Sequence, residues 1–332
     1  NINAGIDAAF LDSRLGFSFD YFVKMNNNML IPVTYPSMLG ATPPDTNSSK
    51  LRTNGFELTL NWTDKIGNVE YSAQFQLSDA KNKLVEYGGS DTYELGLNKT
   101  REGYPINSYF AYVYDGVVKD QADLDAYKKL EGVPSNIGIG DAKFKDLNGD
   151  GKISTYGDKE GDDGDAKYVG STTPRYTFGL NLGAKWNNFD ISVFFQGVAK
   201  RTLFREGEFS MPWSDWWRYP PQFYYGQTWN EDRQDAYYPR LTHGDIRHWN
   251  YQASTMQKIN AAYVRLKNIQ IGYTLPKSLL QKIGIERTRF YVSGQDLFEI
   301  HGVKGGWDPE SDTGGFNYPF QRYYSFGIDL TF

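Results

Sequence analysis

The hydrophobic residues of this chain recur at every second position over many short segments, most clearly in its last eleven residues. Tyr324, Phe326, Ile328, Leu330 and Phe332 would share one face of an extended strand, and small or polar residues fill the alternate positions. A period of two is typical of a strand with one apolar face. A transmembrane barrel strand turns such a face to lipid, whereas a soluble sandwich buries it. This segment alone leaves both folds open.

The same alternation predicts nine strands, several of them joined by tight turns such as Asp12-Ser13 and Asn187-Asn188. A change of phase near Asn268 predicts a β-bulge. Short helices are expected at 123–130 and at 276–283, where proline opens the second helix and Gly284 follows it. The predicted strands lie near residues 2–10, 15–23, 56–62, 69–77, 178–186, 189–195, 264–273, 290–297 and 322–332.

The connections between these strands alternate between short and long, provided that residues 79–173, including the aromatic run 109–114, contain no membrane strand. Short turns on one side and long loops on the other are typical of outer-membrane barrels. The residues at the short-turn ends of the strands that run in one direction are all aromatic, as an interfacial girdle requires. They are Phe10, Trp62, Trp186, Tyr273 and Phe332. We therefore expect an all-β fold, an antiparallel transmembrane β-barrel with long extracellular loops near 79–173 and 199–260.

Nine strands cannot form a complete barrel of this kind. Bacterial single-chain barrels have even strand numbers, and two open sheet edges would leave backbone groups unpaired in lipid. We therefore expect residues 1–332 to be the C-terminal portion of one barrel domain, with further strands upstream or on another chain.

Composition removes several classes of function. Among the 332 residues there is no Cys, which excludes disulfides, thiol nucleophiles and zinc–thiolate sites. The net charge of -5 argues against nucleic acid as a partner, because phosphates need a basic footprint. No run of 18 apolar residues is present, so no transmembrane helix is expected.

Several segments resemble the SusC-like family of TonB-dependent outer-membrane transporters, and they occur in the family's order along most of the chain. They are RTNGFELTLNW (52–62), EGYPINSYFAYVYDG (102–116), DLNGDGKI (146–153), FGLNLG (178–183), DISVFFQG (190–197), YVRLKNIQIGYTLP (263–276), YVSGQDLF (291–298) and the closing strand.

The resemblance implies part of a plugged barrel of about 22 strands in the bacterial outer membrane. The family's plug domain and TonB-contact segment are not among these residues. Family members are non-enzymatic nutrient importers that work beneath a SusD-like lipoprotein and take up glycans, in some cases peptides. The partners so implied are a SusD-like lipoprotein, TonB through the N-terminal part, outer-membrane lipid, and glycan or peptide cargo.

Three alternatives remain open. A siderophore-type TonB-dependent receptor would share the architecture, although the SusC-like segments argue against it. An outer-membrane barrel enzyme would need a His paired with Ser or Asp, and only His243, His248 and His301 could serve. The five-residue spacing of the first two histidines does not match the zinc-binding H-E-x-x-H pattern. A soluble β-rich glycan-binding protein would stay in the aqueous phase without detergent.

One acidic segment matches the beginning of a calcium-binding loop. Asp146, Asn148 and Asp150 supply oxygens at positions 1, 3 and 5, and Gly151 allows the sharp turn at position 6. The usual Glu at position 12 is missing, and Asp158, the next residue, is the candidate substitute. Ca²⁺ is the only cofactor that the sequence suggests. A solvated acidic turn held by Asx hydrogen bonds would give the same pattern.

A second candidate site is the aromatic stretch 211–225 in the later long loop. Flat rings there could stack on sugar faces or pack against a partner protein, and Arg218 offers a donor fork for hydroxyls or carboxylates. A long loop also needs a core of its own, which would bury the same rings. The candidate cargo or partner contacts are Trp213, Trp216, Trp217, Arg218, Tyr224 and Tyr225.

The aromatic end of the last predicted strand generates a first test. An alternating strand that ends on an aromatic residue resembles the signal read by the barrel-insertion machinery. Deletion of Phe332 from the full-length protein should therefore lower its abundance in the outer membrane, measured by membrane fractionation and immunoblotting, whereas Phe332→Tyr should leave it normal. Unchanged abundance after the deletion would exclude this role.

Overall fold

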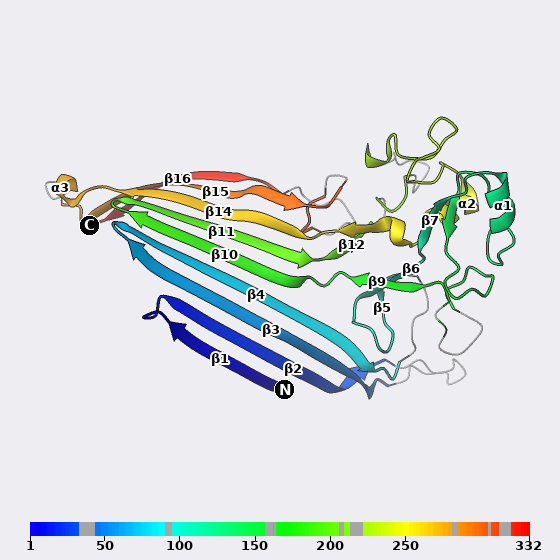
Figure 1. Cartoon of the computed structure of the whole chain (residues 1–332), viewed down its shortest axis with the longest axis horizontal. Helices are drawn as coiled ribbons and strands as arrows, with labels where there is room; N and C mark the ends of the chain where they lie inside the picture. Colours follow the sequence, from blue (N-terminus) through cyan, green and yellow to red (C-terminus); the bar gives the residue numbers. More distant parts are fainter. Residues whose placement is uncertain are drawn as a thin grey trace.

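The computed structural model describes residues 1–32, 44–89, 95–156, 162, 164–205, 209–212, 222–280, 284–304, 307–311 and 320–332. Nine long strands form one antiparallel sheet in which each strand pairs with its neighbour in chain order (Figure 1). They are β1 (Ile2–Phe10), β2 (Leu15–Ile31), β3 (Thr46–Ile66), β4 (Val69–Glu86), β10 (Arg175–Trp186), β11 (Phe189–Lys200), β14 (Tyr263–Thr274), β15 (Arg287–His301) and β16 (Tyr323–Thr331). The nine strands predicted from the alternation are confirmed.

The strand register aligns the apolar positions into continuous rows on one face of the sheet. Leu58 pairs with Leu77, Leu77 pairs with Phe178, and Phe75 pairs with Leu180. Directly paired residues point to the same side, so the rows run across the strands. The side chains of these central rows are half-buried among one another, and others on the same face are exposed, for example Phe326 at 82%. An apolar face of this extent matches a barrel wall that turns it to lipid.

Aromatic residues gather at the short-turn ends of neighbouring strands. Trp186 stacks on Phe189 with ring centroids 6.4 Å apart, and Phe189 lies 4.7 Å from Tyr273 on the next strand. Asn187 completes the turn between the first two with a φ of 52°, a left-handed conformation that asparagine tolerates. Neighbouring strands therefore bring together members of the predicted aromatic girdle.

The opposite face carries a polar bridge across four neighbouring strands. The guanidinium of Arg289 on β15 donates to both carboxylate oxygens of Asp190 on β11, at 3.0 and 2.6 Å. It also donates to Gln270 on β14 at 3.0 Å and to Asp329 on β16 at 3.2 Å. Arg289 can reach across β14 because Gly272 lies beneath it, where any Cβ would collide with the guanidinium.

The predicted bulge is confirmed, but several strand ends extend beyond their predicted limits. The β14–β15 register shifts between Leu266 and Asn268, and the β11–β14 register shifts opposite, between Phe194 and Phe195. β2 continues to Ile31, β3 begins at Thr46 and β4 continues to Glu86. Both faces are largely polar in these extensions, so hydrophobic alternation does not detect them, although the ladder pairing continues.

Short helices occupy parts of the connections. α1 (Gln121–Tyr127) begins after Asp120, whose side chain accepts a hydrogen bond from the backbone N–H of Asp123 at 2.8 Å. α3 (Lys277–Leu280) lies within the predicted helix 276–283, of which residues 281–283 are outside the described part of the chain. Among the described residues, no helix combines the length and the apolar character needed to cross a membrane.

Candidate functional site

The two long excursions, which follow β4 and β11, fold into one packed body at one end of the sheet (Figure 1). We call its described residues 95–156, 164–171 and 222–257 the outer subdomain. The backbone N–H of Tyr112 in the first excursion donates to Ala253 O of the second at 3.1 Å, and Thr255 N–H returns to Tyr112 O at 2.9 Å. Its further elements are β5 (Gly96–Lys99), β6 (Ser108–Ala111), β7 (Tyr114–Val117), β8 (Ala142–Phe144), β9 (Lys167–Ser171) and α2 (Gly244–Asn250).

A buried carboxylate joins the two excursions. Asp141, which is fully buried, accepts two hydrogen bonds of 2.8 Å from the Arg240 guanidinium and one of 2.9 Å from the Asn250 amide. Asn250 in turn accepts a hydrogen bond from Ala142 N–H at 2.8 Å. Hydrogen bonding to Asp141 raises the pKa of Arg240 above its ordinary value. The bidentate contact is of the strong, charge-assisted kind and fixes how the excursions meet.

The aromatic run 109–114 contributes to the core of this subdomain. Residues 108–111 form β6, which pairs with β5 and β9 in a separate three-stranded sheet. Tyr109 is 3% exposed and stacks on Phe204 with ring centroids 3.4 Å apart. The run therefore adds no strand to the nine-stranded sheet. The first excursion nevertheless begins later than residue 79, because β4 extends to Glu86.

Of the predicted cargo contacts, the structure describes only two neighbours, and they differ sharply. Tyr224 is 2% exposed, donates its hydroxyl hydrogen to Phe209 O at 3.1 Å and packs edge-on against Tyr238. Its ring belongs to the core of its own excursion, so it is not available to cargo in this structure. Tyr225 is 91% exposed and stays a candidate. Trp213, Trp216, Trp217 and Arg218 lie outside the described residues.

The predicted calcium loop forms a compact turn held by its own side chains. The two carboxylate oxygens of Asp146 accept hydrogen bonds from Gly149 N–H at 2.6 Å and Gly151 N–H at 2.9 Å. The Asn148 amide donates to Asp150 at 2.9 Å and to Asp162 at 3.1 Å. Asp158 is outside the described residues. Within the described ranges, no three His, Cys, Asp or Glu side chains are arranged to hold a metal ion.

The carboxylate most deeply buried near this turn, that of Asp165, was not a predicted site residue. It is fully buried and accepts hydrogen bonds from Leu147 N–H at 2.6 Å and Ser154 N–H at 3.0 Å. Burial raises the pKa of Asp165, and the negative charges of Asp146 and Asp150 raise it further. Asp165, which follows the calcium-loop motif of residues 146–151 in the chain, therefore holds the acidic loop in place through these backbone hydrogen bonds.

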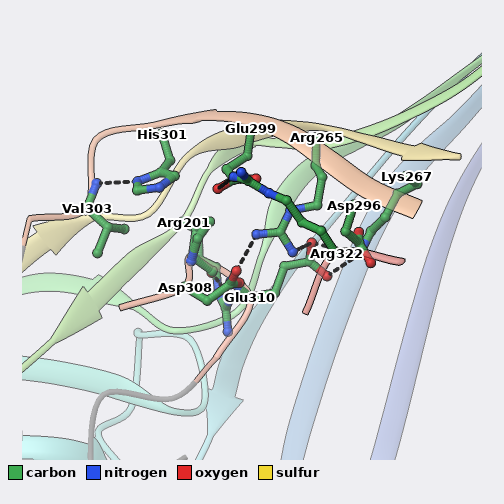
Figure 2. A network of polar contacts seen from close by, with 11 residues as sticks. Arg201, Arg265, Lys267, Asp296, Glu299, His301, Val303, Asp308, Glu310 and Arg322 are labelled. Atoms are coloured by element: carbon green, nitrogen blue, oxygen red, sulfur yellow. Dashed lines mark hydrogen bonds and ion pairs between the residues drawn. The ribbon is translucent and has the colours of Figure 1, made fainter. Parts of the chain in front are cut away.

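A cluster of ion pairs fastens residues 307–311 to the sheet, and Figure 2 shows it from close by. Arg265 on β14 is 1% exposed and pairs with Asp308 and, at 2.8 Å, with Glu310. Lys267 lies 3.0 Å from Glu310 and 3.2 Å from Asp296 on β15. Arg265 precedes the register shift of β14 and Lys267 lies within it, and both reach the carboxylate of Glu310.

The same segment reaches the second excursion through an aromatic contact. Trp307 packs edge-to-face against Phe209 at 5.0 Å and lies 5.3 Å from Phe223. Arg205 faces the rings of Phe223 at 4.7 Å and Tyr238 at 5.3 Å, an arrangement favourable for cation–π attraction. Residues 307–311 thus connect the sheet to the aromatic core that contains Tyr224. The hydrophobic alternation gives no signal of this connection, and the one sequence feature that matches it is the opposite charge of residues 265–267 and 308–310.

The Asp141 contacts generate a prediction about how the outer subdomain is held together. Asp141→Ala would leave the Arg240 guanidinium and the Asn250 amide without their shared partner, so it should destabilise the subdomain by about 3 kcal/mol. Hydrogen exchange and limited proteolysis of the full-length protein would detect this as faster exchange and cleavage within 95–156 and 222–257.

A matched control for this prediction is Asp115→Ala. Asp115 pairs with Lys145 at 3.4 Å on the surface of the same subdomain, with both side chains about half exposed. Its loss should cost no more than about 0.5 kcal/mol. Equal protection from exchange in the two variants would show that the Asp141 bridge does not hold the excursions together.

Calcium binding at Asp146, Asn148 and Asp150 stays a prediction with a direct test. Metal analysis of the purified full-length protein after calcium soaking should find calcium in the wild type and less in Asp146→Ala. Asp125→Ala removes one exposed carboxylate from α1 and serves as the control for a non-specific effect of charge. Equal calcium in all three proteins would leave the hydrogen-bonded turn as the sole role of these residues.

The comparisons with known proteins agree with this architecture. No protein-family model matches the chain. Two curated relatives from Formosa agariphila, TonB-dependent receptors P3 and P26, are 28% and 26% identical to it over its full length. A third relative from the same organism, TonB-dependent receptor P39, is 22% identical over 99% of the chain. The chain spans about a third of the length of each of them, 34–35%.

Solved structures show the same fold. The RagAB peptide transporter superposes on 99% of this chain with a TM-score of 0.75 and 23% identity, and the chain covers 35% of that structure. The RagAB peptide importer in its open-open state gives the same TM-score at 24% identity, with 34% of that structure covered. The relatives along the whole chain and the shared fold show that this chain is similar to a barrel portion of TonB-dependent receptors of the outer membrane.

Proposed function

We propose that the chain forms part of the wall and outer rim of an importer that carries oligosaccharides or peptides across the outer membrane. In this proposal TonB supplies the energy, and a SusD-like surface lipoprotein works with the receptor. The observation that carries it is the outer subdomain, in which two excursions are locked together by Asp141 and Arg240 at one end of the barrel wall. A packed body there offers a stable surface to cargo and to a lipoprotein partner.

The candidate contact residues, which are aromatic rings and an arginine, suit both glycan and peptide cargo. Aromatic rings bury the CH-rich faces of sugars and also the apolar side chains of peptides, and arginine donates to hydroxyls and carboxylates alike. The neighbour RagAB is named a peptide transporter, which favours peptides for a receptor of this shape. The SusC-like segments of the sequence favour glycans, so both classes belong in the test.

The alternative functions make different demands on the protein. A siderophore receptor would take up iron chelates rather than oligomers. A barrel enzyme would need an activated histidine, but His301 Nδ1 accepts a hydrogen bond from Val303 N–H at 3.2 Å, and His248 lies against Arg247 at 3.3 Å. The relatives are named receptors and the structural neighbours transporters, which supports uptake rather than catalysis.

The central test removes two of the candidate rings. The double substitution Trp216→Ala and Trp217→Ala in the full-length receptor should weaken cargo uptake or lipoprotein retention, by about fivefold for each ring that makes contact, since an aromatic contact contributes about 1 kcal/mol. Barrel abundance should stay normal. Uptake of labelled oligosaccharides, peptides and a ferric siderophore would be measured in cells with and without functional TonB.

The control for this test is Tyr156→Ala, which removes an exposed ring (67%) from the acidic turn of the same subdomain. Normal uptake and lipoprotein retention in the double variant would assign Trp216 and Trp217 to loop packing. Uptake of the siderophore alone would favour the siderophore receptor, and uptake independent of TonB would exclude the proposed energy source.

A further inference from the structure

Three cations share the lipid-facing side of the barrel wall at the end nearer the outer subdomain. Arg52 on β3 pairs directly with Lys83 on β4, and Asn54 pairs with Lys81. Further along β3, toward its short-turn end, Phe56 and Leu58 continue this face into the apolar rows. Because side chains alternate with a period of two, Arg52, Lys81 and Lys83 point to the same side as those apolar residues. All three are exposed.

The alternate positions confirm that these cations point away from the barrel interior. Leu84 is 3% exposed, and the Asn82 side chain accepts a hydrogen bond from Ile106 N–H at 2.8 Å. The first excursion therefore covers the face of β4 that carries Asn82 and Leu84. Lys81 and Lys83 lie between these residues in the strand, and so they occupy the opposite, outward face.

The height of the cluster matches the edge of the hydrocarbon layer. Arg52 lies ten residues before Trp62, the girdle residue at the short-turn end of β3. At about 3.3 Å per residue and a strand tilt of roughly 40°, this separation corresponds to a height of about 25 Å. That is about the height of the apolar band of such a barrel. The three cations therefore lie where the hydrocarbon ends and the lipid headgroups begin.

The carboxylates close to this cluster are already engaged. Asp79 accepts hydrogen bonds from Arg175 and from Tyr176 N–H, and Glu86 pairs with Lys50 at 2.6 Å. In the part of the chain that the structure describes, no ion pair involves Arg52, Lys81 or Lys83. Within the described residues, the outward surface thus presents three positive charges that no carboxylate pairs with, next to an apolar surface.

We propose that Arg52, Lys81 and Lys83 bind the phosphate of an outer-leaflet lipid headgroup. Such a lipid matches both halves of the surface: its phosphate accepts charge-assisted hydrogen bonds from the three cations, and its acyl chains lie along Phe56, Leu58 and Tyr21. A soluble anion would use only the cations. A soluble acidic protein would have to enter the headgroup layer to reach them. The three cations next to an apolar surface therefore favour a phosphorylated lipid over a soluble anion or a soluble protein as the ligand.

The test compares neutral variants of the full-length receptor in detergent. Arg52→Gln, Lys81→Gln and Lys83→Gln together should weaken binding of lipid A, the probe, by roughly tenfold or more, since each cation near an anionic lipid surface contributes about a factor of five before screening. Native mass spectrometry would count the lipid bound, and raising the salt concentration should weaken the wild-type complex. Dephosphorylated lipid A should bind both proteins equally weakly.

The control variant removes the same charge away from the membrane boundary. Lys119→Gln, Lys128→Gln and Lys129→Gln replace three exposed lysines at and beside α1 of the outer subdomain, and should leave lipid binding unchanged. Equal lipid A binding by the wild type and the Arg52/Lys81/Lys83 variant would overturn the proposal. Wild-type binding of inorganic phosphate as tight as that of lipid A would identify a free anion site instead. Circular dichroism of each variant would verify that the barrel is intact.

Discussion

Every backbone N–H and C=O within a membrane must be paired by the protein itself, and this constraint governs the whole chain. It accounts for nine strands that each pair with the next, with bulges but no break between β1 and β16. It also means that the outer edges of β1 and β16 need further strands of the barrel beside them. In the described part of the chain, the connecting segments lie beyond the ends of the strands, and there the chain builds its outer subdomain.

The pairing constraint also explains which parts of the fold could be predicted from the sequence. Where one face of a strand meets lipid, every second residue must be apolar, and all nine strands could be recognised from this alternation. Beyond the lipid, the strands no longer need apolar residues at alternate positions. The extensions of β2 and β3 toward Ile31 and Thr46 remain paired, with register shifts between Asn26 and Leu30, but their side chains carry no apolar period. Strand existence was therefore predictable, and strand length was not.

The interior of the outer subdomain could not be predicted, because its contacts join residues far apart in the chain. Asp141 meets Arg240 across 99 positions, and Tyr114 N–H meets the Thr255 side chain across 141. Neither pair has a local signal. The burial of Tyr224 and Tyr225 was equally unpredictable, because these two adjacent tyrosines are identical in sequence but opposite in exposure. Their environments depend on Phe209 and Tyr238, and composition could indicate only that the stretch was aromatic.

The bridge made by Arg289 adds information that the alternation of apolar residues lacks. A register shift of one residue moves the apolar side chains of a strand to the opposite face of the sheet. A shift of two residues returns them to the lipid-facing side and changes their contact with lipid little. Arg289 distinguishes the two registers. If β15 shifted by two residues relative to β14, the Arg289 side chain would no longer cross above Gly272, which has no Cβ to obstruct it. Its hydrogen bonds with Asp190 and Gln270 would then be lost together. The contact of one arginine with one glycine thus selects the native register among several that would place the apolar side chains equally well on the lipid-facing side.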